Sequence, residues 1–298
     1  MKLIKQSFEI LEQKDFTLKG IKQFIERCAR VSYKSEDKIT DTSYEKFVNM
    51  LESRGHDRPL EFGTVYLSRT SQKEDNMKWL DKYAYNPWSK FSFGNGSTRI
   101  NGELRNTIYV TTNYRVIKEH HWEDDLQYLC EPTEYHHKRY TVHMILDRGV
   151  MDEFRTHVGL SHLAESTRYC NYSKDKFNNE VTFIEPCWDI KTANEIITPE
   201  GTHKSSNSYE FLAALKEAEY HYLNLLAKGW TPQQARSVLP LGIKSELISC
   251  GFEDAWENFM RRRSPKYGDP GAHPMAAEIA DKLCEEFLKR GFIDEKKI

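Results

Sequence analysis

Charged and hydroxyl-bearing side chains are concentrated between Asp147 and Ser173, in the run DRGVMDEFRTHVGLSHLAESTRYCNYS. Large aliphatic residues are sparse there, and buried charges need partners, so a segment built only to fill a core would not have this composition. Guanidinium groups form bidentate hydrogen bonds with phosphates and carboxylates. The alternative is a solvated helix face followed by a polar loop. Gly149, Gly159 and the Ser-Thr-Arg-Tyr run that begins at Ser166 favour a binding site over that alternative.

One histidine of this segment, His157, has two interpretations. A lone histidine on a helix is usually structural or exposed, and a metal site needs further His or Cys ligands at suitable spacing. The adjacent pairs at 120–121 and 136–137 do not supply that spacing, so we predict no metal site. Glu153 precedes His157 by one helical turn, and a glutamate at this spacing is expected to orient or charge the imidazole.

Composition excludes several classes of protein. The chain has 298 residues, enough for one large domain or two ordinary ones. Its formal net charge of −2 gives no global field that attracts a nucleic-acid polymer. No apolar run approaches the length of a membrane span, and the N-terminus has no signal-peptide pattern. Six scattered cysteines without a Cys-x-x-Cys pair are typical of reduced thiols, so we expect a cytoplasmic protein.

Several helices and short strands are expected to position the charged segment. Apolar residues at helical spacing predict helices over 17–33, 42–53, 122–129, 150–159, 208–226, 232–237, 253–263 and 276–290. Alternating and β-branched runs predict strands over 3–11, 60–68, 107–112, 139–146 and 180–184. The strand over 139–146 places Val142, Met144 and Leu146 on one face, and the charged segment follows it directly in the chain. This order predicts an α+β fold, with a mixed sheet framed by helices and a helical C-terminal half.

An aromatic-rich stretch at 71–106 interrupts this pattern, and the stretch over 187–207 is polar and irregular. Aromatic residues interleaved with Lys and Arg can stack nucleobases. An ordered loop that packs its aromatic side chains onto its own scaffold is the interpretation we favour. We therefore expect one domain over 1–298 with an insertion at 71–106.

The charged segment resembles the signature region of the flavin-dependent thymidylate synthases, the ThyX family. Their motif runs Arg-His-Arg, a short spacer containing Ser, then Glu-x-Ser-x-Arg-Tyr. Without gaps, this motif falls on His157, Ser161, Ser166, Arg168 and Tyr169. The resemblance extends from Arg30 to about Phe287 and includes three further phrases: Arg30–Tyr33, Ala235–Leu241 and Trp256–Arg263.

The resemblance implies a ThyX-like fold and a definite reaction. Members methylate dUMP to dTMP, with methylene-tetrahydrofolate as the carbon source, NADPH as the reductant and FAD as the cofactor. No protein nucleophile is required, so Cys170 need not attack the base. The substrate is a pyrimidine nucleoside monophosphate, bound with the flavin where the subunits of a homotetramer meet.

Individual roles follow from the same resemblance. The substrate-binding residues are Glu153, Ser166, Arg168, Arg236 and Arg263. Arg168 and Arg236 hold the phosphate, to which Ser166 adds a hydroxyl or an N–H, and Glu153 contacts the pyrimidine. Arg263 is also the catalytic residue, because a fixed guanidinium stabilises negative charge that builds on the ring carbonyls. The cofactor-binding residues are His157, Ser161 and Asn258.

Departures from the family pattern concern the flavin positions, which here are Phe62, Thr156, Val158, Phe252 and Asp254. The two motif arginines are replaced by Thr156 and Val158, and Arg155 regains their contact only if the helix rotates by about 100°. FAD is therefore expected to bind weakly. Two alternatives stay open: a flavin-free nucleotide-binding paralogue or non-catalytic subunit, and an enzyme that acts on another pyrimidine nucleotide.

Overall fold

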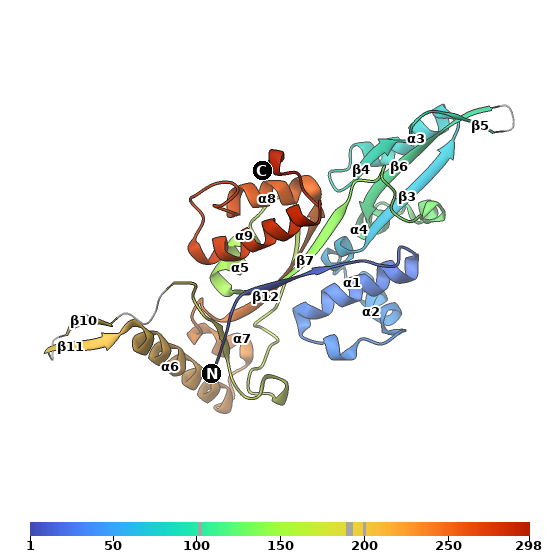
Figure 1. Cartoon of the computed structure of the whole chain (residues 1–298). Helices are drawn as coiled ribbons and strands as arrows, with labels where there is room; N and C mark the ends of the chain where they lie inside the picture. Colours follow the sequence, from blue (N-terminus) through green and yellow to red (C-terminus); the bar gives the residue numbers. More distant parts are fainter. Residues whose placement is uncertain (101–102, 189–192, 199–200) are drawn as a thin grey trace.

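The chain folds around a four-stranded antiparallel sheet with the strand order β2-β7-β12-β8. The computed structural model describes residues 1–100, 103–188, 193–198 and 201–298. The strands are β2 (Ser7–Leu11), β7 (Arg139–Asp147), β8 (Ser161–Ala164) and β12 (Lys244–Phe252). In Figure 1, β7 and β12 cross the middle of the molecule between two groups of helices. The predicted α+β class is confirmed.

Helices cover both faces of this sheet. On one face α1 and α2 share a hydrophobic core with Ile248 and Cys250 of β12. On the other face α5, α8 and α9 pack against Val142, Met144 and Leu146, the three residues that the alternation in β7 places together. These helices are α1 (Leu18–Tyr33), α2 (Ser43–Ser53), α5 (Arg148–Phe154), α8 (Glu253–Arg263) and α9 (Pro274–Lys289).

The strand β12 was not among the elements predicted for the C-terminal half. It lies between β7 and β8, and every residue after Lys244 is buried. Because both faces of the strand are covered, its sequence shows no alternation of apolar and polar residues. Ser245 and Ser249 lie in the buried interior as well, which further hides the strand.

A second antiparallel sheet, β3-β6-β4, extends from one end of the molecule, and β5 pairs with β6. Its strands and the helix α3 together occupy most of the 71–106 stretch, so the expected loop there is wrong. Trp79 and Tyr83 of α3 are buried and pack against Tyr128 and Trp122, as the favoured interpretation of these aromatics expected. The elements are β3 (Thr64–Ser71), α3 (Lys73–Ala84), β4 (Lys90–Phe93), β5 (Thr98–Ile100), β6 (Glu103–Asn113) and α4 (Tyr114–Glu119).

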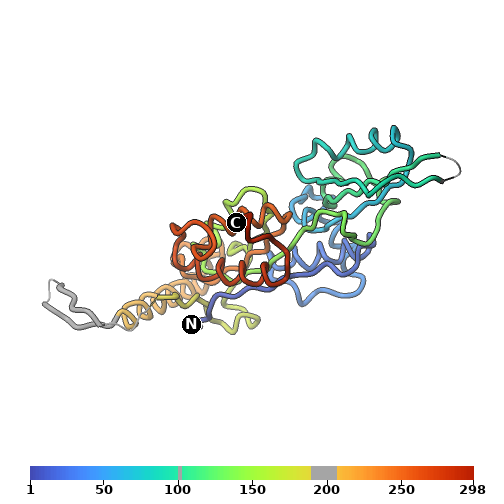
Figure 2. Tube along the Cα trace, turned by 45° about the horizontal axis from the view of Figure 1, so that its top comes forward, coloured from blue at the N-terminus to red at the C-terminus, as the bar shows by residue number. Residues whose placement is uncertain are grey.

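The long helix α6 (Asn207–Ala227) extends at the opposite end, as Figure 2 shows. It packs near α7 (Pro232–Ala235) and a parallel pair formed by β1 (Lys2–Ile4) and β9 (Thr182–Ile184). The 187–207 stretch, expected to be irregular, contains an antiparallel hairpin of β10 (Ala193–Thr198) and β11 (Gly201–Ser206). The rest of that prediction, at 189–192 and 199–200, lies outside the described residues. In the part of the chain that the structure describes, no helix is long and apolar enough to span a membrane.

Two of the predicted strands have other limits in the structure than the sequence predicts. The strand expected over 3–11 is divided into β1 and β2, which belong to different sheets. Gln6 lies between them and donates from its amide to the backbone oxygen of Met275 at 2.8 Å. The strand expected over 60–68 begins only at Thr64, because η2 (Arg58–Phe62) forms a 3-10 helix before it. Phe62 is therefore a fully buried core residue.

Candidate active site

The short helix α5 divides its charged side chains between two faces. Asp147 caps its N-terminus by accepting a hydrogen bond from the N–H of Val150 at 2.8 Å. Arg148, the first residue of α5, and Arg155, which follows its end, share the carboxylate of Asp152, at 3.1 Å each. Adjacent helical residues are about 100° apart, so the side chain of Glu153 leaves the helix on a different face.

The segment after β8 is tied to the sheet and to α1 by its backbone. The N–H of Glu165 donates to the backbone oxygen of Glu246 at 2.8 Å, and that of Ser166 donates to the backbone oxygen of Ser32 at 3.2 Å. The Glu165 carboxylate is buried and accepts from Lys244 at 2.9 Å. These contacts fix the turn that presents Ser166 and Arg168.

Together these elements form a pocket of about 380 Å³, which we call the arginine pocket. Its cationic lining consists of Arg58, Arg148, Arg155, Arg168 and Arg236. The side chains of Ser32, His162, Glu165, Ser166 and Thr167 also line it.

Three of these guanidinium groups lack a carboxylate partner among the described residues. Arg236 donates from Nη1 to the hydroxyl of Thr167 at 2.9 Å, and Arg168 lies over the ring of Tyr169 with its guanidinium carbon 5.6 Å from the centroid. Arg58 makes no ion pair within the described chain. Exposed cations that converge on one pocket without an anion form a site for an oxyanion.

Beneath the pocket lies a buried network of lysines and glutamates. Glu246 pairs with Lys34 and Lys244 and accepts from His143 at 2.8 Å. Burial by itself raises the pKa of the Glu246 carboxyl, but the hydrogen bond from His143 and the two lysine charges outweigh it and lower the pKa. The network keeps the Glu246 carboxylate, which lies beneath the pocket, ionised and in a fixed position.

The thiol of Cys170 is unsuited to act as a nucleophile. It is buried and donates to the Glu165 carboxylate at 3.4 Å. Burial, followed by the negative charge of Glu165, raises the pKa of the Cys170 thiol to about 12. A thiolate is the reactive form of cysteine, so this side chain has no nucleophilic role at neutral pH.

His162 supports the pocket from behind and was not among the predicted site residues. Its pKa is lowered to about 4, first by burial and then by the charges of His157, Arg58 and Arg155. The neutral ring donates from Nε2 to the backbone oxygen of His157 at 3.2 Å and accepts at Nδ1 from the Ser249 hydroxyl at 2.8 Å. It thereby fastens the loop that follows α5 to the central sheet.

Glu153 and Arg263 are brought together, but outside the arginine pocket. Arg263 donates to the Glu153 carboxylate and, from Nη2, to the Glu153 backbone oxygen at 3.4 Å. Glu153 lines a different cavity of about 440 Å³, beside Trp188 and Met275. The expected contact of Glu153 with His157 is replaced by this ion pair, and α5 ends at Phe154, before His157.

Within one chain, the positions that the resemblance assigns to the flavin do not fit that cofactor. His157 and Ser161 are buried, and the imidazole Nε2 and the hydroxyl have no hydrogen-bond partner among the described residues. Asn258 accepts from Arg262 at 3.3 Å on α8. Thr156 and Val158 follow the end of α5, so the helix rotation that would let Arg155 replace them does not apply.

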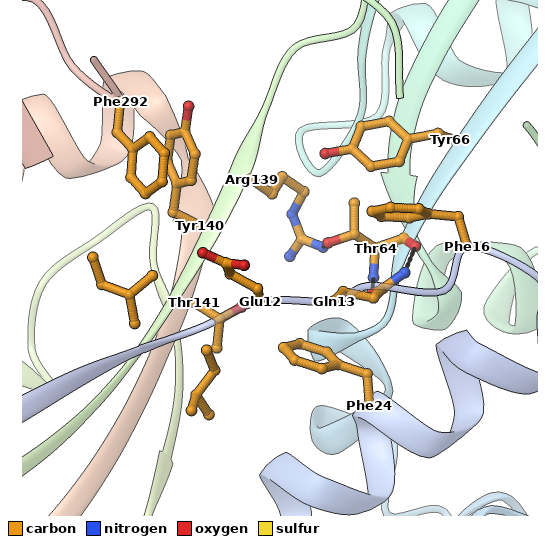
Figure 3. A pocket seen from close by; sticks show the side chains of 12 residues that line it. Glu12, Gln13, Phe16, Phe24, Thr64, Tyr66, Arg139, Tyr140, Thr141 and Phe292 are labelled. Atoms are coloured by element: carbon orange, nitrogen blue, oxygen red, sulfur yellow. Dashed lines mark hydrogen bonds between the residues drawn. The ribbon is translucent and has the colours of Figure 1, made fainter. Parts of the chain in front are cut away.

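A third cavity, of about 300 Å³, lies where the two sheets meet. Figure 3 shows aromatic rings around the guanidinium of Arg139. Arg139 donates to the hydroxyl of Thr64 at 3.1 Å and to the backbone oxygen of Glu61 at 2.8 Å, while the Gln13 amide bonds the Thr64 backbone twice. These polar groups form hydrogen bonds with one another. We therefore interpret the cavity as part of the contact between the two sheets.

The described residues contain no group of three or more His, Cys, Asp or Glu side chains arranged to hold a metal ion. Sequence reasoning also missed Arg58, because nothing in its local sequence signals a contact that arises only when η2 packs beside β8. The pocket does bring Ser166 and Arg168 together with Arg236, which lies 68 residues after Arg168 in the chain.

The chain was compared with solved structures and curated proteins. Two solved structures of a UMP/dUMP methylase PolB from Streptomyces cacaoi, bound with 5-Br UMP and with 5-Br dUMP, are similar to this chain. They are 14% and 15% identical, cover all of this chain and 94% and 95% of theirs, with TM-scores of 0.44 and 0.42. No curated protein matches the chain.

The model of one sequence family, described as thymidylate synthase complementing protein, matches residues 90–290. The matched span holds the charged segment, the pocket residues from Arg148 to Arg236, and the Glu153–Arg263 pair. It covers well over half of the chain, and the chain therefore belongs to the thymidylate synthase complementing protein family, the ThyX family.

Proposed function

We propose that the arginine pocket binds the phosphate of a pyrimidine nucleoside monophosphate. The observation that carries this proposal is the convergence of Arg58, Arg168 and Arg236 without a carboxylate partner among the described residues. Arg168 and Arg236 contact the phosphate directly, and Ser166 adds its hydroxyl or its backbone N–H. The buried lysine–glutamate network holds the pocket floor in place while the anion is exchanged.

In this proposal the chain is an enzyme that methylates dUMP to dTMP. Arg263 donates to a carbonyl of the uracil ring and stabilises the negative charge that develops when C5 reacts. Glu153 holds the guanidinium of Arg263 through its carboxylate and backbone oxygen. Family membership supports methylene-tetrahydrofolate and NADPH as co-substrates and FAD as the cofactor.

A homotetramer is part of the same proposal. Arg168 lines the arginine pocket, whereas Glu153, the partner of Arg263, lines a different cavity of the same chain. One nucleotide reaches both groups if a second copy supplies the Glu153–Arg263 pair beside the first copy's arginine pocket. His157, Ser161 and Asn258 are assigned to the same shared site. All six cysteines are free thiols, in keeping with the proposed cytoplasmic location.

A second candidate function is nucleotide binding without a flavin. It is favoured by the buried Phe62 and by the uncharged Thr156 and Val158, which stand where the family binds its cofactor. The absorbance spectrum of the purified protein separates the two candidates, because a flavin has a visible band and the apoprotein does not.

The nucleotide site is tested by calorimetric titration of dUMP into the wild type and Arg168→Ala. Each charge-assisted hydrogen bond contributes about 1.5–3 kcal/mol, so the variant should bind roughly tenfold or more weakly. Its thermal melting temperature should not change, because Arg168 is exposed and makes no ion pair within the described chain. Unchanged dUMP affinity in a folded variant would remove the phosphate assignment.

A further inference from the structure

We propose that the long helix α6 binds a second copy of this chain, in an antiparallel pair of α6 helices. The inference rests on the proposed homotetramer and names the surface through which two of its copies make contact. The helix spans 21 residues and lies at the end of the molecule opposite the β3-β6-β4 sheet.

Apolar side chains occupy two opposite sides of α6. Leu215 and Tyr222 are buried in the core that the helix shares with β9 and α7. Tyr220 lies about 140–160° around the helix from these two residues, and it is 62% exposed. Tyr209 and Ala213 lie within about 20° of Tyr220. A helix that is apolar on two sides needs two partners, and the core supplies one of them.

The second apolar side of α6, which we call its outer face, carries Tyr209, Ala213, Lys216 and Tyr220. The two tyrosines are exposed, and the first eight residues of the helix, 207–214, are all exposed or half-buried. Figure 2 shows this half of α6 extending away from the body of the molecule. Exposed aromatic side chains that gather on one surface are typical of a protein–protein contact, and an extended helix leaves room for a second chain to lie along it.

The outer face is complementary to itself when two copies of α6 pack antiparallel around a two-fold axis. An axis between Lys216 and Glu217 brings each lysine opposite the glutamate of the second copy. The same register places the small Ala213 opposite the large Tyr220, so one side chain leaves room for the other. The His221 imidazole lies 3.4 Å from the Glu217 carboxylate and is charged only when protonated, so Glu217 remains available to a lysine. Charge and shape thus favour a second copy of this chain as the occupant.

The area of the contact shows that more than the two helices must take part. A 21-residue helix is about 31 Å long and offers a strip about 10 Å wide, or about 300 Å² on each copy. A stable interface buries about 800 Å² on each partner. In an antiparallel pair, the first half of one α6 lies along the second half of the other and along the residues that follow it. Trp230, three residues after the end of α6, is exposed at that place.

The same arrangement brings a second chain towards the cavity that Glu153 lines. Phe211, in the first half of α6, lines this cavity too. A helix that packs along this half has its axis about 10 Å from that of α6. The second copy therefore comes close to the cavity at which the proposed shared site needs another chain.

Light scattering on wild type and Tyr220→Glu tests the α6 contact. Wild type should have the mass of four chains. The variant should have the mass of two chains or one, because a carboxylate buried in an apolar contact opposes association. Tyr85→Glu is the matched control, because Tyr85 is an exposed tyrosine of another part of the chain, and it should keep the wild-type mass. Far-UV circular dichroism shows that each variant is folded.

A charge exchange tests the antiparallel register independently. Lys216→Glu places two carboxylates opposite each other at both ends of the two-fold contact, so association should weaken about tenfold, and less as salt rises. Adding Glu217→Lys to this variant restores opposite charges, so association should return to within about threefold of wild type. Equal association of wild type and Lys216→Glu at low salt would overturn the pairing of Lys216 with Glu217.

The mass of four chains in Tyr220→Glu, or a monomeric wild type, would overturn the α6 contact. Either result leaves the phosphate site to its own test, since the arginine pocket lies within one chain. A wild-type tetramer that dissociates in Tyr220→Glu but binds no dUMP would remove the proposed function and leave the α6 contact in place.

Discussion

Arg263 holds Glu153 at two points, donating to its carboxylate and to its backbone oxygen. The pair connects the end of α8 to α5, so the guanidinium has a fixed direction relative to the short helix. A cation that stabilises a transition state is effective because its position is set before the reaction begins. Glu153 is thus a positioning residue as well as a proposed contact to the pyrimidine.

Replacement of Glu153 by Gln should lower turnover more than nucleotide affinity. The neutral amide loses one charge-assisted hydrogen bond to Arg263, of about 1.5–3 kcal/mol, part of which positions the guanidinium. We expect kcat to fall roughly tenfold with KM for dUMP nearly unchanged. Tritium release from 5-tritiated dUMP measures both. Glu285→Gln, which removes an exposed ion pair with Lys266, is the control. A rise in KM alone would show that Glu153 only binds.

The hydrogen bond from Arg236 to Thr167 should show coupling in dUMP affinity. Thr167→Val removes the hydroxyl that orients the guanidinium at 2.9 Å, and we expect dUMP to bind about three- to tenfold more weakly. In an Arg236→Ala background the same change should have no further effect. Additive losses in this double-mutant cycle, followed by calorimetry, would mean that Thr167 does not act through Arg236.

Mixed assemblies should separate the two halves of the proposed shared site. Arg168→Ala and Arg263→Ala homotetramers are each expected to be inactive, because each lacks one half of every site. Coexpressed with different tags, the two variants should form mixed tetramers that regain part of the wild-type turnover. Light scattering on the wild type should give the mass of four chains. A monomer that binds dUMP, or mixed tetramers without activity, would contradict the shared site.

His162 should make stability depend on pH. Its pKa is about 4 in the folded chain, against an ordinary value of 6.5, so below pH 6.5 the unfolded state binds the proton more readily. Stability is therefore fully present above about pH 6.5 and is lost as the pH falls towards 4, by on the order of 3 kcal/mol in total. His136 and His157, whose pKa values are also lowered by burial, add losses of the same sign.

Urea unfolding from pH 7.5 to 4.5 measures this loss in the wild type and in His162→Gln. The groups that face the imidazole are the Ser249 hydroxyl, the His157 backbone oxygen and the cations Arg58 and Arg155. The variant should be less stable at neutral pH and should show a shallower fall in acid. Equal slopes for the two proteins would show that folding does not lower the pKa of His162.

The sequence was informative where a pattern is local. Apolar spacing located α1, α2, α6, α8 and α9 to within two residues, and alternation placed Val142, Met144 and Leu146 on one face of β7. These patterns did not predict β12, whose residues are buried on both faces, or the four-residue β8. Both strands depend on partners far along the chain, so their own residues carry no periodic signal.

The same distinction applies to the site. Ser166, Arg168 and Arg236 were identified by motif, and the fold does gather them in one pocket. Arg58 and His162 were not identified, because their roles come from neighbours contributed by η2, α5 and β12. Glu153 and Arg148 belong to the same helix but line different cavities, because they lie on different faces of α5. A linear motif does not show on which face of a helix each residue lies.

The flavin positions provide the last prediction. A dinucleotide diphosphate is usually neutralised by arginines, and Thr156 and Val158 carry no charge. Two lost contacts of about 1.5–3 kcal/mol each weaken binding roughly a hundredfold or more. Wild type should therefore need excess FAD for reconstitution, whereas a Thr156→Arg, Val158→Arg double variant should bind it more tightly. Val158 is 86% exposed and Thr156 is also exposed, so neither substitution disturbs the core.

Fluorescence titration of FAD compares the two proteins, with Thr156→Gln, Val158→Gln as the control for side-chain length without charge. The arginine variant should bind more tightly than both wild type and control, and the difference should shrink as salt screens the added charges. Tight stoichiometric binding by the wild type would contradict the prediction, and would mean that other cations neutralise the diphosphate. Absence of binding by all three proteins would favour the flavin-free paralogue, because charge at these positions would then not be what the cofactor site lacks.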